Sequence, residues 1–134
     1  MTLGVRGVVE NARGEVLLVR HTYTKGLFLP GGGVERGETT EESLRRELEE
    51  EGGVKVTRTP ELIGVFSNHR VFRNDHVLLY RVRSDAWVAG GDPIGREISE
   101  ILWCDPRIPP EDTTPGTQRR LRELFYSEPP SLMW

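Results

Sequence analysis

Apolar side chains recur along the chain in short runs and alternations, a pattern that is typical of β-strands. We predict such strands at residues 3–9, 15–21, 27–29, 54–56, 61–67, 75–82 and 97–103. The turn sequence Asn-Ala-Arg-Gly at residues 11–14 separates the first two strands and predicts an opening β-hairpin. Residues 30–33 are Pro-Gly-Gly-Gly and predict a loop, and residues 84–95 are rich in turn formers.

Two segments have the period of an amphipathic helix instead. In residues 39–51, Thr39 followed by Glu42 matches a capping box, and Gly52 with Gly53 predicts the helix end. In residues 115–126 the apolar side chains recur at helical spacing. Several strands with one helix in the middle and one at the end predict a single α+β domain over residues 1–134. Residues 128–134 form a possible tail that either docks on the body or meets a partner.

Length and composition agree with a single domain. The 134 residues suffice for one hydrophobic core, and the lone cysteine, Cys104, cannot form an internal disulfide. The apolar runs are too short to span a bilayer, and residues 1–10 lack the features of a signal peptide. We therefore expect a cytoplasmic protein that is not associated with a membrane.

The formal net charge is −3, but the acidic residues are concentrated in one segment. Residues 35–51 contain eight glutamates and three arginines, a balance of −5, whereas the remaining residues carry 13 acids and 15 bases. The overall charge argues against a chain-wide DNA-binding surface. The acidic segment therefore needs an explanation of its own.

Three carboxylates of this segment lie on one face of the predicted helix, because Glu47, Glu50 and Glu51 are spaced i, i+3 and i+4. Like charges at this spacing destabilise a helix, and a hard divalent cation with oxygen ligands would compensate them. Arg46 lies one turn before Glu50 and would orient it. The alternative interpretation is a solvated helix face with Glu–Arg pairs. The glycines just before the helix allow a ligand or another strand to approach the backbone closely, and in combination with the carboxylates they favour a binding site.

The spacing of these residues resembles that of the Nudix family. Gly32, five residues, Glu38, seven residues and then the run Arg46-Glu47-Leu48-Glu49-Glu50-Glu51-Gly52-Gly53-Val54 fit the Nudix box G-x5-E-x7-R-E-U-x-E-E-x-G-U, where U is a bulky aliphatic residue. Every fixed position of the box is present. The segments before and after the box also resemble the family, so the likeness extends over nearly the whole chain.

This resemblance implies a mixed β-sheet sandwiched between α-helices, the α/β/α Nudix fold. It also implies an activity: the protein would hydrolyse a pyrophosphate bond in a nucleoside diphosphate linked to another moiety. In this reaction water attacks phosphorus. The expected substrates are NTP, dNTP or NDP-sugar-like small nucleotides, and the expected cofactor is Mg²⁺ or Mn²⁺. We expect a monomer or a homodimer. The alternative is a nucleotide-sensing binding module of the same fold without catalysis, and the intact box weighs against it.

The resemblance assigns two sets of residues to the site. The implied metal ligands are Glu47, Glu50, Glu51 and the carbonyl group of Gly32. The implied supporting residues are Glu38 and Arg46, with Gly33 beside the bound cofactor. Arg46 would act by holding a glutamate of the box in place.

Residues outside the box are further candidates. In this family the general base is not always in the box, and Glu97 and Glu100 are possible bases. These two residues are three apart in a predicted strand and would face opposite sides, so at most one points at the site, and we favour Glu97. The candidates for substrate binding are Phe28 or Phe72, to stack on a base, and Arg20, His21, Arg70 and Arg73, to meet phosphates.

Overall fold

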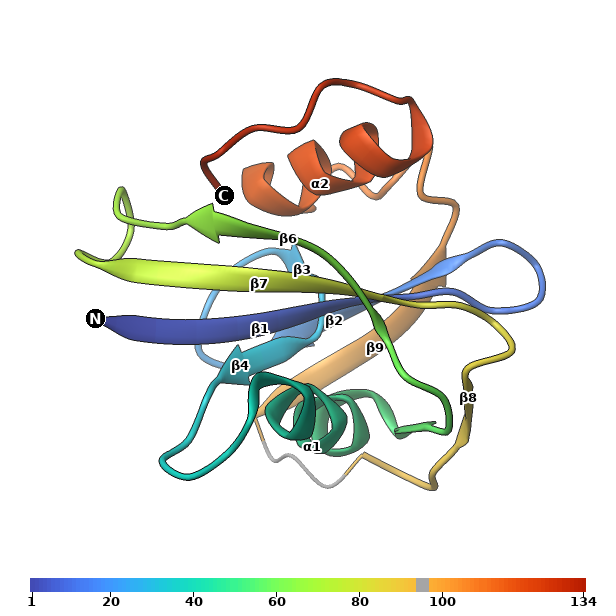
Figure 1. Ribbon diagram of the computed structural model, residues 1–134. Helices are drawn as coiled ribbons and strands as arrows, with labels where there is room; N and C mark the ends of the chain where they lie inside the picture. The colour runs from blue at the N-terminus through green and yellow to red at the C-terminus, as the bar shows by residue number, and fades with distance from the viewer. Residues whose placement is uncertain (94–96) are drawn as a thin grey trace.

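Short strands and two helices make up the computed structural model, which describes residues 1–93 and 97–134 (Figure 1). The elements are β1 (Thr2–Val9), β2 (Val16–His21), β3 (Leu27–Phe28), β4 (Gly31–Gly33), α1 (Thr40–Gly52), β5 (Val54–Val56), β6 (Glu61–Ser67), β7 (Asp75–Val82), β8 (Trp87–Ala89), β9 (Ile98–Cys104) and α2 (Pro115–Phe125). Part of the turn-rich stretch predicted at residues 84–95, namely residues 94 and 95, lies outside the described residues.

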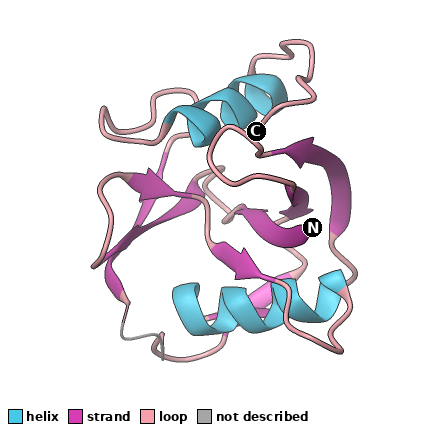
Figure 2. Ribbon diagram, turned by 90° about the vertical axis from the view of Figure 1, so that its left-hand side faces the viewer, coloured by secondary structure: helices cyan, strands magenta, loops and turns pink. Residues whose placement is uncertain are grey.

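The strands form three small sheets between the two helices. The largest has the order β4-β1-β7-β6, in which β1 and β7 are parallel and the other pairs antiparallel. The other two sheets have the orders β3-β2-β9 and β5-β8. Figure 2 shows α1 and α2 on opposite sides of the strands. The mixed α+β architecture with helices on both sides is the predicted fold.

The predicted opening hairpin is confirmed at its turn, where the Asn11 amide donates to the Glu15 carbonyl at 3.0 Å, but the two strands do not pair along their length. Within the described part of the chain, β1 pairs with β4 and β7, β2 pairs with β3 and β9, and an isolated bridge between Glu10 and Val16 joins the two strands. The physical reason is burial. Both strands carry consecutive buried residues and face a core on each side, so each takes its partners from a different sheet.

The predicted loop at residues 30–33 and the turn-rich stretch after residue 84 each contain a short strand. Gly31–Gly33 forms β4 and pairs antiparallel with β1. A Cβ atom on Gly31 would lie 1.9 Å from the Val5 carbonyl oxygen, so this strand needs glycine to approach β1 closely. Trp87–Ala89 forms β8 and pairs with β5. Neither segment is long enough to show a strand pattern in its sequence.

Both ends of α1 lie where the capping residues predict them. The hydroxyl of Thr39 accepts a hydrogen bond from the amide of Glu42 at 3.1 Å. At the other end Gly53 adopts the left-handed conformation, with φ of 64°, and its amide bonds to the Glu49 carbonyl. The helix is therefore held in register with the residues before and after it.

The apolar face of α1 fixes the direction of its acidic face. Leu44 and Leu48 are fully buried, and a Cβ atom on Gly7 of β1 would lie 3.1 Å from Leu48. Close contact between helix and strand at Gly7 leaves little freedom for rotation of α1. Glu47 and Glu51 are thereby directed toward β4 and β2, where the candidate site lies.

The C-terminal residues dock on the body of the protein, which is one of the two outcomes expected for the tail. The ring of Trp134 lies 5.8 Å from that of Phe66, and its amide donates to the Ser67 carbonyl at 2.9 Å. Cys104 is a buried free thiol. No helix of the described residues has the length and apolar character needed to cross a membrane.

Candidate active site

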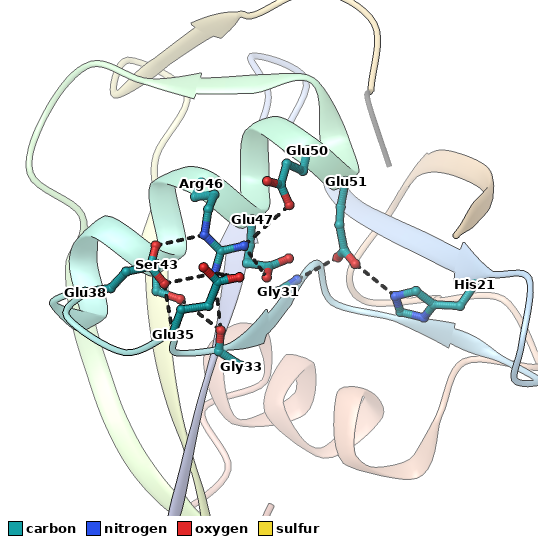
Figure 3. A network of polar contacts seen from close by, with 10 residues as sticks. All are labelled: His21, Gly31, Gly33, Glu35, Glu38, Ser43, Arg46, Glu47, Glu50 and Glu51. Carbon is teal, nitrogen blue, oxygen red and sulfur yellow. Dashed lines mark hydrogen bonds and ion pairs between the residues drawn. The ribbon is translucent and has the colours of Figure 1, made fainter. Parts of the chain in front are cut away.

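Arg46 is the centre of the polar network beside α1 (Figure 3). Its Nε and Nη2 donate to the two carboxylate oxygens of Glu38 at 2.8 and 2.9 Å, a two-pronged ion pair. Its Nη1 donates to Glu47 at 2.9 Å and to Glu50 at 3.4 Å. The expected contact with Glu50 is present, and the contacts with Glu38 and Glu47 are shorter.

The Arg46 network ties the loop before α1 to the helix. The hydrogen bonds from Arg46 and from the Glu35 amide lower the pKa of Glu38 to about 2. Arg46 Nη2 and Ser43 Oγ both donate to the Gly33 carbonyl at 3.3 Å. Gly33 and Glu38, which the resemblance places near a cofactor, are therefore positioned by Arg46.

Glu47 lies directly over the glycine backbone of β4. A Cβ atom on Gly32 would come within 2.5 Å of Glu47 Oε1, so a larger residue at position 32 would displace this carboxylate. Burial raises the pKa of Glu47 and the nearby charge of Glu51 adds to the rise, whereas Arg46 opposes it. The Glu47 carboxylate is thus partly buried and packed closely against the Gly32 backbone.

Glu51 is the most buried of the three box carboxylates, with 9% of its surface exposed. Its Oε1 accepts from the Gly31 amide at 2.9 Å and its Oε2 contacts His21 Nε2 at 3.1 Å. His21, proposed from the sequence as a phosphate contact, is therefore a buried partner of Glu51. Its position at the end of the apolar strand β2 was the one signal that could have indicated burial.

The three box carboxylates have different partners. In the part of the chain that the structure describes, no three acidic, histidine or cysteine side chains form a ready-made metal cage. Glu47 and Glu50 bond to Arg46, and Glu51 bonds to β4 and β2. The donor set nevertheless fits a hard cation, because it offers only oxygen ligands and Glu47 carries an incompletely balanced buried charge. Glu50, with a side chain 43% exposed, has the freedom to turn toward such an ion.

A pocket of about 730 Å³ adjoins this cluster. Four of the candidate substrate-binding residues line it: His21, Phe28, Arg70 and Phe72. Among the described residues, Arg20 and Arg73 lie outside its lining, and Arg20 instead binds Glu100 and Asp112.

Arg6 also lines the pocket and was not anticipated from the sequence. Its Nη1 donates to the Leu29 carbonyl at 2.8 Å, and its guanidinium lies 5.6 Å from the centre of the Phe28 ring. Burial lowers the pKa of Arg6, and the charges of Glu51 and Glu47 oppose this shift. A cation held between an aromatic ring and the box carboxylates is well placed to meet an anionic ligand.

The two candidate bases outside the box have different surroundings. Glu100 forms an ion pair with Arg20 at 2.9 Å, which engages its carboxylate. Glu97 is exposed just before β9 and close to Tyr23, whose pKa is raised by burial and further by the charges of Glu51 and Glu97. The Tyr23 ring lies 5.1 Å from that of His21, so Glu97 is on the same side of the protein as Glu51. Its role as base stays a prediction.

Comparison with known proteins agrees with the fold and the box. A family model described as NUDIX domain matches residues 1–125. An 8-oxo-dGTP diphosphatase of Haemophilus influenzae is 34% identical over 126 residues, which cover 91% of this chain and 89% of the relative. An ADP-ribose pyrophosphatase of Methanocaldococcus jannaschii is 38% identical over 79 residues, covering 57% and 46% of the two chains. The crystal structure of a MutT NUDIX hydrolase from Burkholderia pseudomallei superposes with a TM-score of 0.75 at 21% identity, over 92% of this chain and 97% of the other.

The fold, the family match and the named relatives define a Nudix hydrolase domain. The chain belongs to the NUDIX family.

Proposed function

We propose that this protein hydrolyses the pyrophosphate bond of a small nucleotide, with a nucleoside triphosphate as the first substrate class to test, in the presence of Mg²⁺ or Mn²⁺. The observation that carries the proposal is the Arg46-centred carboxylate network beside a pocket of nucleotide size. The triphosphate is chosen because the Haemophilus influenzae relative, which aligns with most of this chain, is named an 8-oxo-dGTP diphosphatase. A cytoplasmic location and a monomeric or homodimeric state belong to the same proposal.

The metal ion would be held by Glu47, Glu50 and Glu51 with the carbonyl group of Gly32. When bound, it would neutralise phosphate charge and lower the pKa of a coordinated water molecule. Hydrogen bonds within the protein restrain the three carboxylates of this site. Arg46 restrains Glu47 and Glu50, while the Gly31 amide and His21 restrain Glu51.

The remaining residues of the site act on the substrate and on the attacking water. Arg6 and Arg70 line the pocket and bind the phosphates, which brings phosphorus toward the carboxylates. Glu97 accepts the proton of the attacking water, whose oxygen forms a bond to phosphorus. The P–O bond of the anhydride breaks, and the leaving phosphate group departs as an anion.

A turnover screen tests the proposal. The panel contains NTPs and dNTPs including 8-oxo-dGTP, NDP-sugars, dinucleoside polyphosphates and capped RNA mimics, each with Mg²⁺, Mn²⁺ or EDTA. We expect a nucleoside monophosphate and pyrophosphate from the triphosphate, and no turnover in EDTA. Nucleotide binding by folded protein without turnover of any panel member would support the sensing module instead and overturn the proposal.

A matched pair of variants tests the site. Glu50→Gln removes a partly exposed carboxylate without disturbing the core, so we expect kcat to fall by about 100-fold or more with the fold retained. Glu49→Gln makes the same charge change one position away, on an exposed side chain, and leaves activity near wild type. Equal activity in both variants would contradict the assignment of Glu50.

A further inference from the structure

The last residues of the chain are attached to β6. Residues 131–134, hereafter the C-terminal segment, lie beyond the residues that match the family model. The Ser67 amide donates to the Leu132 carbonyl at 2.8 Å, and the Trp134 amide donates to the Ser67 carbonyl at 2.9 Å. Figure 1 shows the chain returning from α2 to end beside β6. The C-terminal segment is therefore a short extension of the sheet.

A buried arginine of α2 holds this segment in place. The side chain of Arg120 is fully buried, and its guanidinium lies 4.0 Å from the Phe66 ring and 5.3 Å from the Trp134 ring. It donates to the Met133 carbonyl at 2.8 Å and to Glu123 at 2.7 Å. A buried guanidinium is costly unless its donors are satisfied. The segment therefore supplies the hydrogen-bond acceptor of Arg120 Nη1, the Met133 carbonyl.

The first turn of α2 is shaped to receive the indole of Trp134. A Cβ atom on Gly116 would lie 2.6 Å from Trp134 Nε1 and 2.8 Å from its Cδ1. Any larger residue at position 116 would displace the ring. Arg119 also donates through Nε to the Trp134 main-chain oxygen at 3.0 Å. The ring is thus fixed from its backbone and from the helix beside it.

The fixed indole is part of the pocket that adjoins the carboxylates. Met133 and Trp134 line this pocket together with His21, which contacts Glu51. Two large side chains of the lining, Tyr23 and Phe72, are 68% and 66% exposed. A ligand with phosphates near Glu51 and a flat apolar group beyond them would cover these side chains.

We propose that Trp134 is a specificity-determining residue, whose indole forms the wall against which the planar base of the nucleotide packs. On this view Met133 and Trp134 are a part of the substrate pocket that lies beyond the residues matched by the family model. This inference rests on the proposed function for the identity of the ligand. It concerns binding, so it can be tested separately from hydrolysis.

Steady-state kinetics on the best substrate of the screen give the first test. Trp134→Ala removes the wall, and we expect KM to rise about tenfold while kcat stays within about twofold of wild type. Trp134→Phe keeps a flat ring and restores part of the loss. Leu132→Ala changes a residue of the same segment that is 82% exposed and lies outside this pocket's lining, so it leaves both constants unchanged.

Gly116→Ala gives a second test in which the tryptophan remains. The added methyl group displaces the indole, so KM rises as in Trp134→Ala, while circular dichroism shows a folded protein. An unchanged KM in both Gly116→Ala and Trp134→Ala would overturn the inference. So would a loss of kcat with KM unchanged, because that is the result of a disturbed catalytic cluster.

Tryptophan fluorescence in EDTA separates the inference from the proposed function. Titration with dGTP is expected to quench the wild-type emission, and Trp134→Phe is expected to lose this change while Trp87 and Trp103 remain. Quenching without turnover in the screen would support the wall and contradict only the hydrolysis. Turnover without any difference in quenching between wild type and Trp134→Phe would contradict the wall and leave the hydrolysis intact.

Discussion

Arg46 offsets part of the charge repulsion within the acidic segment, residues 35–51. Eight glutamates lie between residues 35 and 51, and Arg46 contacts three of them, Glu38, Glu47 and Glu50, within 3.4 Å. Its charge balances only part of theirs, and burial together with Glu51 still raises the pKa of Glu47. The residual negative charge is what would attract a divalent cation and, through it, an anionic substrate.

The ion pair of Arg46 with Glu38 predicts how stability changes with pH. The pKa of Glu38 is about 2 in the folded protein against an ordinary 4.5, so the charged form is favoured by folding. A depressed carboxyl pKa stabilises above pH 4.5, and this contribution is lost as the pH falls from 4.5 toward about 2. Glu38→Gln is therefore expected to lower Tm at pH 7 and to match wild type near the acidic end of this range.

Thermal unfolding followed at several pH values between 7 and about 2 measures this difference. Glu49→Gln is the control, because its exposed side chain should give a small difference from wild type that does not follow the same window. A Tm difference between wild type and Glu38→Gln that stays constant from pH 7 to the acidic end would show that the pair does not contribute as described.

At the scale of elements, the C-terminal end of α1 sets the position of Glu50 and Glu51, two of the proposed metal ligands. Gly53 has φ of 64°, and a Cβ atom there would lie 2.4 Å from the Gly91 carbonyl oxygen. Gly53→Ala therefore adds a steric conflict to the cost of a left-handed alanine. Gly14→Ala is the matched control, because Gly14 has φ of 79° with nothing within 4 Å of the added carbon.

Chemical denaturation should separate the two costs. We expect Gly14→Ala to lower the free energy of unfolding by about 1 kcal/mol, the cost of the left-handed conformation. Gly53→Ala should lower it by about 1–3 kcal/mol more, because the conflict with the Gly91 carbonyl is added. Equal losses in the two variants would show that the close approach at Gly91 is relieved at no cost.

The elements whose limits are set by residues close together in the sequence were predicted correctly. β6 and β7 begin and end as predicted, because each contains a short run of apolar residues that favour strands and is bounded by turn residues. Thr39 and Gly53 mark the ends of α1 because capping is a contact within a few residues. Pairing was not predictable in the same way. The partners of β1 and β2 are chosen by burial on two faces, and glycine strands such as β4 have no side chains to form a pattern.

In the candidate site too, local contacts were predictable from the sequence and long-range contacts were not. The box residues follow a fixed spacing, and the contacts of Arg46 with Glu47 and Glu50 are local on one helix. His21 and Glu51, which are in contact, are 30 residues apart in the sequence. Trp134, at the C-terminal end of the sequence, lines the same pocket as His21. Contacts of this kind depend on the tertiary fold and leave no periodic signal in the sequence.

At the scale of the whole molecule, the described residues form two hydrophobic cores, one under each helix. The core under α1 contains Val5, Val9, Leu17, Leu44, Leu48, Val54, Val56, Tyr80, Val82 and Ala86. The core on the α2 side contains Val8, Val16, Leu18, Leu27, Leu29, Phe66, Leu79, Cys104 and Leu121. Strands β1 and β2 contribute to both, so the carboxylates beside α1 and the pocket beside α2 are built on shared strands.

Deletion of residues 128–134 tests whether the C-terminal segment belongs to the second core. Trp134 packs against this core, and its loss leaves Phe66 uncovered and Arg120 without the Met133 carbonyl. We expect the free energy of unfolding to fall by about 2–4 kcal/mol, with the mass in solution unchanged. Denaturant titration and sedimentation measure the two quantities. A lower mass with unchanged stability would show instead that the segment joins two copies of the chain.

Cys104 provides an independent reporter of the same core. Burial raises the pKa of its thiol to about 11, so in the native protein at pH 8 the thiol is protonated as well as covered. We expect slow labelling by a thiol reagent in wild type, and full labelling in denaturant. The deletion should accelerate labelling, because the core opens more often when Trp134 is gone. Rapid labelling of the intact native protein would contradict the burial of Cys104, and an unchanged rate after deletion would place the segment outside this core.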